Sequence, residues 1–171
     1  MGKEPIKCAL WGMLVGNIES MGILPALQGG EAVARCLEET GGDVLQKLAQ
    51  IDGENNYEIT EKNGFKYVIL KHCPFAAIYK DIPAWGDKAM HLVEAYNKKS
   101  DGGGALHPLC LVHKGIRNAM KAGIISIGCR SESSGKIEIA ENALAKAHIS
   151  REEAAAMIEG KACLFAIKIE A

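Results

Sequence analysis

The chain has 171 residues, of which 48% are hydrophobic and 24% are charged, an ordinary composition for one globular domain with a substantial core. Its 20 basic and 21 acidic residues leave a net charge of -1. Without a basic run to contact phosphates, we expect no direct nucleic-acid ligand. The apolar stretch at residues 8–15 is far shorter than the about 20 residues of a membrane-spanning helix, so we expect no membrane partner.

The N-terminal third carries helical periodicity. We predict helices over Ala9–Met21, Gly30–Glu39 and Asp43–Ile51, the last two separated by a pair of glycines. This helical part is expected to cover residues 1–52. Neither its mixed charge nor its short apolar stretch is typical of an export signal, which favours a cytoplasmic location.

A β-hairpin follows. The segments Tyr57–Thr60 and Phe65–Lys71 flank an Asn63-Gly64 pair, and such a pair tolerates the positive φ angles of a tight turn. Cys73 comes at the end of the second strand, where Pro74 removes a backbone donor and favours an extended residue before it.

A helix is predicted near Trp85–Lys98, followed by a glycine-rich loop over residues 100–108. Pro108 is well suited to begin the next helix, because its missing N–H would have no helical partner in the first turn. Helical spacing then places these residues on one apolar face: Leu109, Val112, Ile116, Ala119 and Met120. Cys110 lies in the first turn, where the positive end of the helix dipole favours a thiolate.

The last third alternates strands and helix. We predict strands over Ile124–Cys129 and Lys136–Ala140, with Ile125, Ile127 and Cys129 sharing a face of the first. A capping box at Ser150 and Glu153 begins a helix that ends near Gly160. In the final strand, Lys161–Ile169, alternation puts Cys163 at the start of the core-facing row.

These elements predict a single α+β domain over residues 1–171. A helical N-terminal third precedes a mostly antiparallel sheet of about five strands, packed against helices on one side. The cysteine-containing part spans residues 57–171.

The six cysteines are expected to be thiols, since reducing compartments disfavour disulfides. Cys8 and Cys36, inside helical patterns, are expected in the core. Cys73, Cys110 and Cys163 fall at element boundaries, which gather at the rim of a sheet. His107 is three residues before Cys110 and can turn toward the same point, so zinc or an iron–sulfur cluster is a possible ligand. No CxxC pair is present, and separated cysteines also commonly serve as core residues.

The remaining polar motifs indicate less. We expect His72, His91, His113 and His148 to be solvated or satisfied histidines, and Arg130 to be a surface arginine. The glycines at 102–104 do not form a phosphate-binding loop, because the required lysine is missing.

Several short motifs resemble known families. The order CPF (73–75), a proline at 83, HPLC (107–110) and GKACLFAI (160–167) resembles the C-terminal sensory part of SufR-like iron–sulfur regulators and related ArsR-type regulators. The run from Leu109 to Arg130, with the late GKACLF, is similar to the four-vinyl-reductase domain, which binds small ligands. The resemblance implies Cys73, Cys110 and Cys163 as ligands, with Cys129 or His107 completing the set.

Three functions follow as hypotheses. The first is a non-catalytic sensor or carrier that binds a metal, an iron–sulfur cluster or a small ligand through cysteines gathered at one sheet edge. The second is a small hydrolase resembling the aminothiazoline carboxylate hydrolases, with Cys110 as nucleophile and His107 or His113 as base. The third is a structural assembly subunit with inert thiols. A homodimer is expected.

Overall fold

The predicted α+β class is confirmed by the computed structural model, which describes residues 5–75, 87–99, 104–120, 123–131 and 134–169. The described residues form these helices and strands: α1 Pro5–Met21, α2 Leu24–Glu38, α3 Val44–Asp52, β1 Tyr57–Lys62, β2 Phe65–Leu70, α5 Asp87–Asn97, α6 Pro108–Ala119, β3 Ile124–Arg130, β4 Ile137–Ile139, α7 Glu141–Lys146, α8 Arg151–Ile158 and β5 Cys163–Lys168. Of the helices, only α7 was not predicted. Trp85, with which the predicted fifth helix begins, lies outside the described residues.

The sheet places the last strand of the chain at its centre. The strand order is β1-β2-β5-β3-β4 and every pair is antiparallel. The predicted hairpin is confirmed, with φ of 53° at Asn63 and 79° at Gly64 in its turn. Because β5 is inserted between β2 and β3, residues more than ninety positions apart become direct neighbours, such as Leu70 and Cys163.

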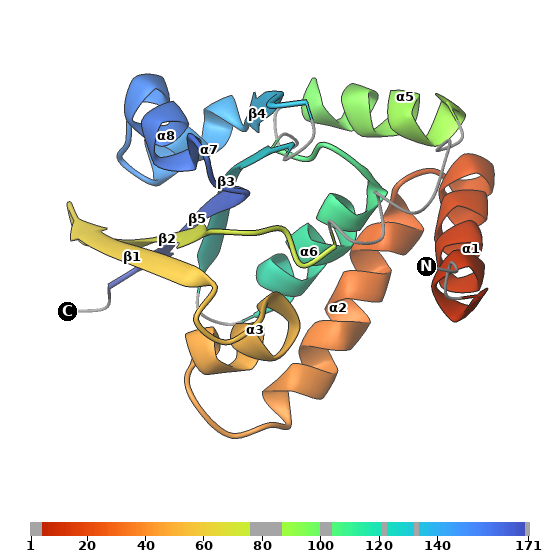
Figure 1. Cartoon of the computed structure of the whole chain (residues 1–171), viewed down its shortest axis with the longest axis horizontal. Helices are drawn as coiled ribbons and strands as arrows, with labels where there is room; N and C mark the ends of the chain where they lie inside the picture. Colours follow the sequence, from red (N-terminus) through yellow and green to blue (C-terminus); the bar gives the residue numbers. More distant parts are fainter. Residues whose placement is uncertain (1–4, 76–86, 100–103, 121–122, 132–133, 170–171) are drawn as a thin grey trace.

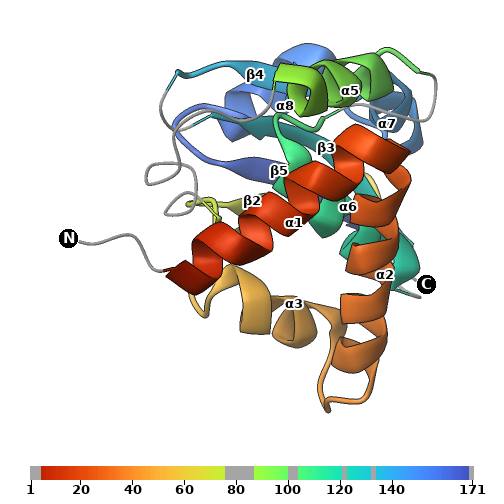
Figure 2. The same ribbon diagram turned by 90° about the vertical axis from the view of Figure 1, so that its right-hand side faces the viewer.

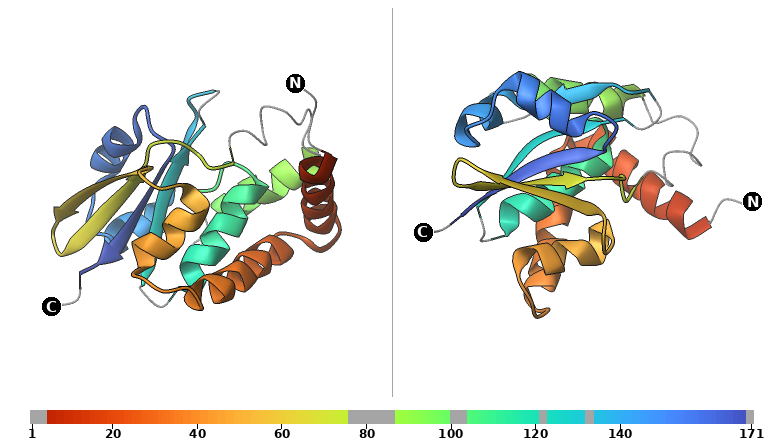
Figure 3. Two further views of the ribbon diagram at one scale, coloured as in Figure 1. Left: turned by 60° about the horizontal axis from the view of Figure 1, so that its bottom comes forward. Right: turned by 60° about the vertical axis from the view of Figure 1, so that its left-hand side comes forward.

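Helices cover both faces of the sheet, so the prediction of one covered face is wrong (Figure 1). One face packs on α7 and α8, and the other faces α2, α3 and α6, as the right-hand view of Figure 3 shows. Strand β5 is accordingly buried on both sides: Leu164 and Ala166 contribute to one cluster, and Phe165 and Ile167 to the other. A central strand with helices on both faces has no solvent side, so β5 is apolar from Cys163 to Ile167 and only its last residue, Lys168, is exposed.

A bulge breaks the predicted alternation of β3. The register against β5 shifts between Ser126 and Gly128, which leaves Ile127 as the extra residue. Ile127 is fully buried in the cluster beneath α8, so it does not share a face with Cys129. Beyond the bulge, Cys129 lies directly opposite Cys163.

Two glycines allow α2 and α6 to cross in backbone contact. A Cβ atom at Gly30 would collide with the carbonyl oxygen of Val112, and one at Gly115 with that of Leu27. Glycine is therefore required inside α2, and this helix begins at Leu24 rather than at Gly30, where the sequence predicted its start. Figure 2 shows α1 lying across α2 and α6 on the outer side. A third apolar cluster joins α1, α2, α5 and α6.

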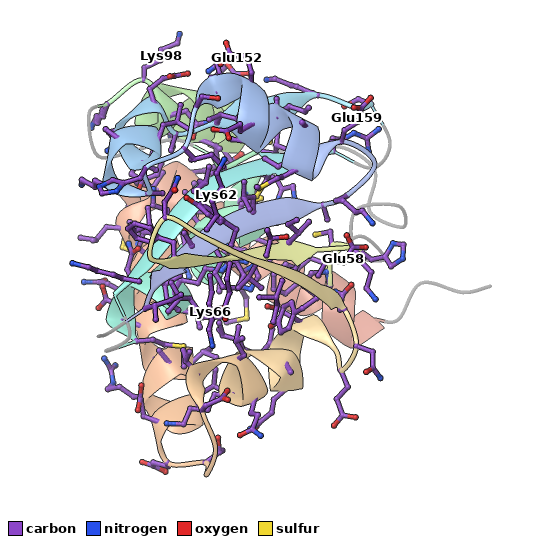
Figure 4. All side chains as sticks on the ribbon, turned by 90° about the vertical axis from the view of Figure 1, so that its left-hand side faces the viewer. Glu58, Lys62, Lys66, Lys98, Glu152 and Glu159 are labelled. Atoms are coloured by element: carbon purple, nitrogen blue, oxygen red, sulfur yellow. The ribbon has the colours of Figure 1, made fainter. Side chains whose placement is uncertain are left out.

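The outer strand β1 carries charge along its length. All but the first of its residues are exposed; Glu58 and Lys62 are labelled on it in Figure 4, and Glu61 pairs with Lys66 of β2 at 3.5 Å. Lys62 pairs with Glu153 at 2.5 Å, and Glu58 pairs with Lys161. Charged side chains on an edge strand oppose pairing with another chain. None of the described helices has the length and apolarity needed to cross a lipid bilayer.

The crossing of α2 and α6 generates a stability prediction. Replacing Gly30 with alanine should destabilise the fold by at least about 1–3 kcal/mol, because backbone atoms of α6 must move to admit the methyl group. Gly29→Ala is the matched control, since a Cβ atom there has nothing within 4 Å and should stabilise the helix by about 0.5–1 kcal/mol. Urea denaturation of both variants measures the difference. Equal effects at the two positions would contradict the close crossing.

Candidate functional site

Three cysteines from three separate elements line one small cavity. Cys110 lies in the first turn of α6, Cys129 near the end of β3, and Cys163 at the start of β5. The Sγ atoms of Cys129 and Cys163 are 3.0 Å apart, and the Cys129 thiol also hydrogen-bonds the thiol of Cys110. The sheet therefore brings together sulfurs that are 19 to 53 positions apart in the chain.

The loop before α6 fixes the position of Cys110. Asn97, the last residue of α5, holds Ala105 through two side-chain hydrogen bonds to its backbone, of 2.6 and 3.3 Å. Gly104, at a φ of 75°, lies so close to Gly128 that a Cβ atom would be 3.2 Å from the Cα of Gly128. His107 then caps the helix, because its Nδ1 accepts the backbone N–H of Cys110 at 3.2 Å.

A buried arginine adjoins the sulfurs. Arg117 is 2% exposed and its Nη1 donates to Cys163 Sγ at 3.3 Å. Its guanidinium carbon lies 4.2 Å from the centre of the Phe165 ring, a cation–π contact. A guanidinium remains charged in any protein environment, so the thiol cavity has a permanent positive charge in its wall.

The charge of Arg117 is balanced through His113 and Asp52. Arg117 Nη2 is 3.2 Å from His113 Nδ1, and His113 Nε2 is 2.7 Å from Asp52 Oδ1. Because arginine can only donate, Nδ1 must carry the lone pair and Nε2 the proton that faces the carboxylate. Tyr57 donates to Asp52 Oδ2 at 2.6 Å, which completes a buried polar chain from β1 to the thiols.

Burial and neighbouring charges set the protonation of this polar chain. Desolvation lowers the pKa of His113, with a further contribution from Arg117, so His113 is neutral. For Asp52, desolvation acts to raise the pKa, but the interaction with His113, the charge of Arg117 and the hydrogen bond of Tyr57 together hold it below 3.8. The network therefore contains one cation and one anion at neutral pH.

The thiols of Cys129 and Cys163 are held protonated. The hydrogen bond that the Cys129 thiol donates to Cys110 raises the pKa of Cys129 well above its ordinary value, aided by burial, against the lowering effects of the Cys163 hydrogen bond and of Arg117. The hydrogen bond to Cys129 and burial likewise raise the pKa of Cys163, against the charge of Arg117. Neither thiol is therefore an activated nucleophile at neutral pH.

The cavity itself is the size of one small ligand. Its volume is about 10 Å³, which is the lower limit for a single water molecule. Arg117 Nε and Ser126 Oγ are buried atoms of its lining for which the described residues offer no hydrogen-bond partner. Buried polar atoms of this kind call for an explanation such as a bound water or ion.

The predicted ligands are placed as follows. Cys110, Cys129 and Cys163 line the cavity, and His107 contacts Cys110. Cys73 is half-buried against the same apolar cluster as Cys129 and Cys163, and is not among the described residues of the cavity lining. Within the described part of the chain, no group of three or more His, Cys, Asp or Glu side chains is already arranged to hold a metal ion.

Outside the cavity, the prediction of a core role for Cys36 is wrong, since this thiol is exposed. It lies near the C-terminal end of α2, whose buried stripe consists of Ala26, Gly30, Ala34 and Leu37. The side chain of Cys8 lies outside the described residues.

The contact between His107 and Cys110 is poorly suited to nucleophilic catalysis. The sulfur lies 3.1 Å from Nδ1 and 3.2 Å from Nε2, so it is aligned with neither nitrogen. Burial lowers the pKa of His107 to about 3, which makes it a weak base for a thiol proton. The cavity that the described residues form has a volume of about 10 Å³, which is smaller than an organic substrate.

The sequence analysis missed Arg117, Asp52 and Tyr57, and it considered His113 only as a solvated or satisfied histidine or as a base for Cys110. One signal was available: Cys110, His113 and Arg117 follow the i, i+3, i+7 spacing of a single helical stripe. On α6, His113 and Arg117 are buried and Cys110 is half-buried, whereas Ala119, predicted on the apolar face, is exposed. Phe75 packs edge-on against His113 with ring centres 5.7 Å apart, so the CPF motif supports the network.

Comparisons with known proteins add no family: no protein-family model, no curated protein and no solved structure matches this chain.

The balance between Arg117 and Asp52 generates a second prediction. Asp52→Asn should destabilise the fold by about 3–5 kcal/mol, because it leaves a buried guanidinium without its counter-charge. The control is Asp43→Asn at the other end of α3, where Asp43 is an N-cap and asparagine caps equally well. Urea denaturation at pH 7 gives both free energies of unfolding, and adding Arg117→Met to Asp52→Asn should recover part of the loss.

The stability of the protein at low pH provides an independent check on the pairing of Asp52 with Arg117. A carboxylate whose pKa is lowered by folding stabilises the protein above its ordinary pKa of 3.8 and loses that contribution as pH falls through the lowered value. The stability difference between wild type and Asp52→Asn should therefore shrink below pH 3.8. A stability difference that grows as the pH falls would contradict a lowered pKa for Asp52.

Proposed function

We propose that the chain is a non-catalytic metal-binding protein that holds one thiophilic ion, such as Zn²⁺, through Cys110, Cys129 and Cys163. One observation carries this proposal: three thiols from α6, β3 and β5 line a cavity with room for a single atom-sized ligand. Thiolate sulfur is the donor that zinc and other soft ions prefer in proteins.

The charges around the cavity favour a divalent ion as the ligand. Three thiolates bound to one divalent cation form a site with a net charge of about -1. The Arg117 guanidinium donates to Cys163 and therefore lies next to this negative charge, which it attracts. In the metal-free chain the same guanidinium faces neutral thiols and depends on Asp52 for compensation. The buried arginine thus lowers the cost of turning the thiols into thiolates.

The spacing of one pair of sulfurs requires only a small local adjustment. Sulfurs bound to one tetrahedral zinc ion lie about 3.8 Å apart, as follows from a Zn–S distance of about 2.3 Å. The Sγ atoms of Cys129 and Cys163, which are 3.0 Å apart, would have to move apart by about 0.8 Å to reach this spacing. An iron–sulfur cluster requires a larger opening, so a single ion is the better fit to this cavity.

His107 is the candidate for a fourth ligand. Its ring lies against Cys110, with Nε2 3.2 Å from the sulfur, and its lowered pKa leaves it neutral, as a metal ligand must be. Cys73, which the family resemblance implies as a ligand, is the competing candidate. The expected homodimer and cytoplasmic location remain predictions.

Metal titration of single-cysteine variants tests the ligand set. Co²⁺ is added to reduced, anaerobic protein, and thiolate-to-cobalt absorption reports binding; Zn²⁺ competition then gives the zinc affinity. Cys110→Ser, Cys129→Ser and Cys163→Ser should each weaken binding by at least about 100-fold, since even residues outside the ligand shell cost 10–100-fold. Cys36→Ser, at an exposed position, is the control and should bind as wild type.

Two further variants decide the fourth ligand. His107→Asn keeps an N-cap for α6 and should weaken binding, whereas Cys73→Ser should not. Wild-type affinity in all three cavity variants would sink the proposal.

The pH dependence of zinc affinity is a separate test. Because the pKa values of Cys129 and Cys163 are raised well above their ordinary value, binding must displace thiol protons. The apparent affinity should then rise about tenfold per pH unit for each proton released. A profile between pH 6 and 8 that is flat would contradict thiolate ligation.

A further inference from the structure

Cys129 and Cys163 occupy the one kind of position in an antiparallel sheet where facing side chains come closest. They are register partners on β3 and β5, and the next pair along is hydrogen-bonded, with Arg130 N–H donating to the carbonyl of Ala162 at 2.8 Å. The cysteines are therefore a non-hydrogen-bonded pair, for which Cα atoms lie about 4.5 Å apart. That separation falls within the range of disulfides.

The sulfurs also already face each other. Their separation of 3.0 Å must shrink by only about 1 Å to form a bond of ordinary length. Both strands are held in the sheet on their other edges, by β4 and β2, so the backbone keeps the two residues in register. A pair of thiols at this distance has a high effective concentration for reaction with each other.

We propose that Cys129 and Cys163 form a reversible intramolecular disulfide, and that this oxidation closes the thiol cavity to metal. The first half stands on strand register alone. The second half rests on the proposed metal-binding function, because the disulfide would remove two of the three sulfur ligands. The chain would then act as a redox-controlled metal site.

The oxidation balances with a hydroperoxide as oxidant. The attack runs through the minor thiolate form of Cys129, the more exposed of the pair: the thiol loses its proton, and the thiolate attacks one oxygen of hydrogen peroxide. The O–O bond breaks, the sulfur becomes a sulfenic acid, and the leaving hydroxide takes up the proton as water. Cys163 then attacks the oxidised sulfur, an S–S bond replaces the S–O bond, and its proton leaves with the hydroxide as a second water.

Arg117 is positioned to assist the second step. Its Nη1 donates to Cys163 Sγ, so it stabilises negative charge on the attacking sulfur. Both thiols together lose two electrons, and the peroxide is reduced to two molecules of water. A dithiol reductant reverses the reaction by thiol–disulfide exchange.

Disulfide mapping tests the first half. Reduced, metal-free chain is treated with one equivalent of hydrogen peroxide, digested without reduction and analysed by mass spectrometry. We expect one cross-link, between the peptides of Cys129 and Cys163, with the loss of two hydrogens. It should persist in Cys36→Ser and Cys110→Ser and be lost in Cys129→Ser. A main cross-link between Cys110 and Cys129, or an equal yield in urea-unfolded chain, would overturn the register argument.

Metal binding of the oxidised chain tests the second half. The affinity for Co²⁺ should fall by at least about 100-fold on oxidation and return on reduction with a dithiol. Unchanged affinity after complete disulfide formation would overturn the control of metal binding. If the reduced chain bound no metal while the disulfide formed as expected, the proposed function would fail and the redox pair would stand. Because Cys163 is buried, replacing it would disturb the packing of the core. Counting the free thiols of the wild type before and after oxidation provides a readout that needs no such variant.

Discussion

The buried guanidinium of Arg117 is the constraint on which this structure depends. A permanent charge removed from water is costly unless it is paired and hydrogen-bonded. Here it lies on the Phe165 ring, donates to Cys163 and reaches Asp52 through His113. The fold must therefore bring α3, α6 and β5 together with atomic accuracy, since each supplies one partner of the same cation.

This constraint couples the stability of the fold to the chemistry of the thiols. The charge that Asp52 compensates is also the charge that favours thiolates at Cys163. Metal binding or oxidation would act on sulfurs that are already part of the core packing. A change at the sulfurs would therefore act on two strands and a helix, because these elements form the wall of the cavity.

The site was only partly predictable. Cys110 and Cys163 were expected at a sheet rim because each begins an element, and both line the cavity. Arg117 was missed because an arginine in an amphipathic helix is usually solvated, and α6 is an exception: it lies between the sheet and α2, so two of its faces are buried. Cys129 could not be ranked above Cys73, because the bulge at Ser126–Gly128 decides which way Cys129 faces.

The sequence by itself determined the local structure: the hairpin turn at Asn63-Gly64, the caps of α3 and α8, the start of α6 at Pro108, and an α+β class. These features follow from interactions among residues a few positions apart, which the chain order makes visible. Tertiary structure decided which thiols meet, because that depends on β5 entering the sheet between β2 and β3. It also decided that α2 continues through Gly30, since only the approach of α6 explains a glycine there. Contacts between distant segments are set by packing over the whole domain, and no local pattern encodes them.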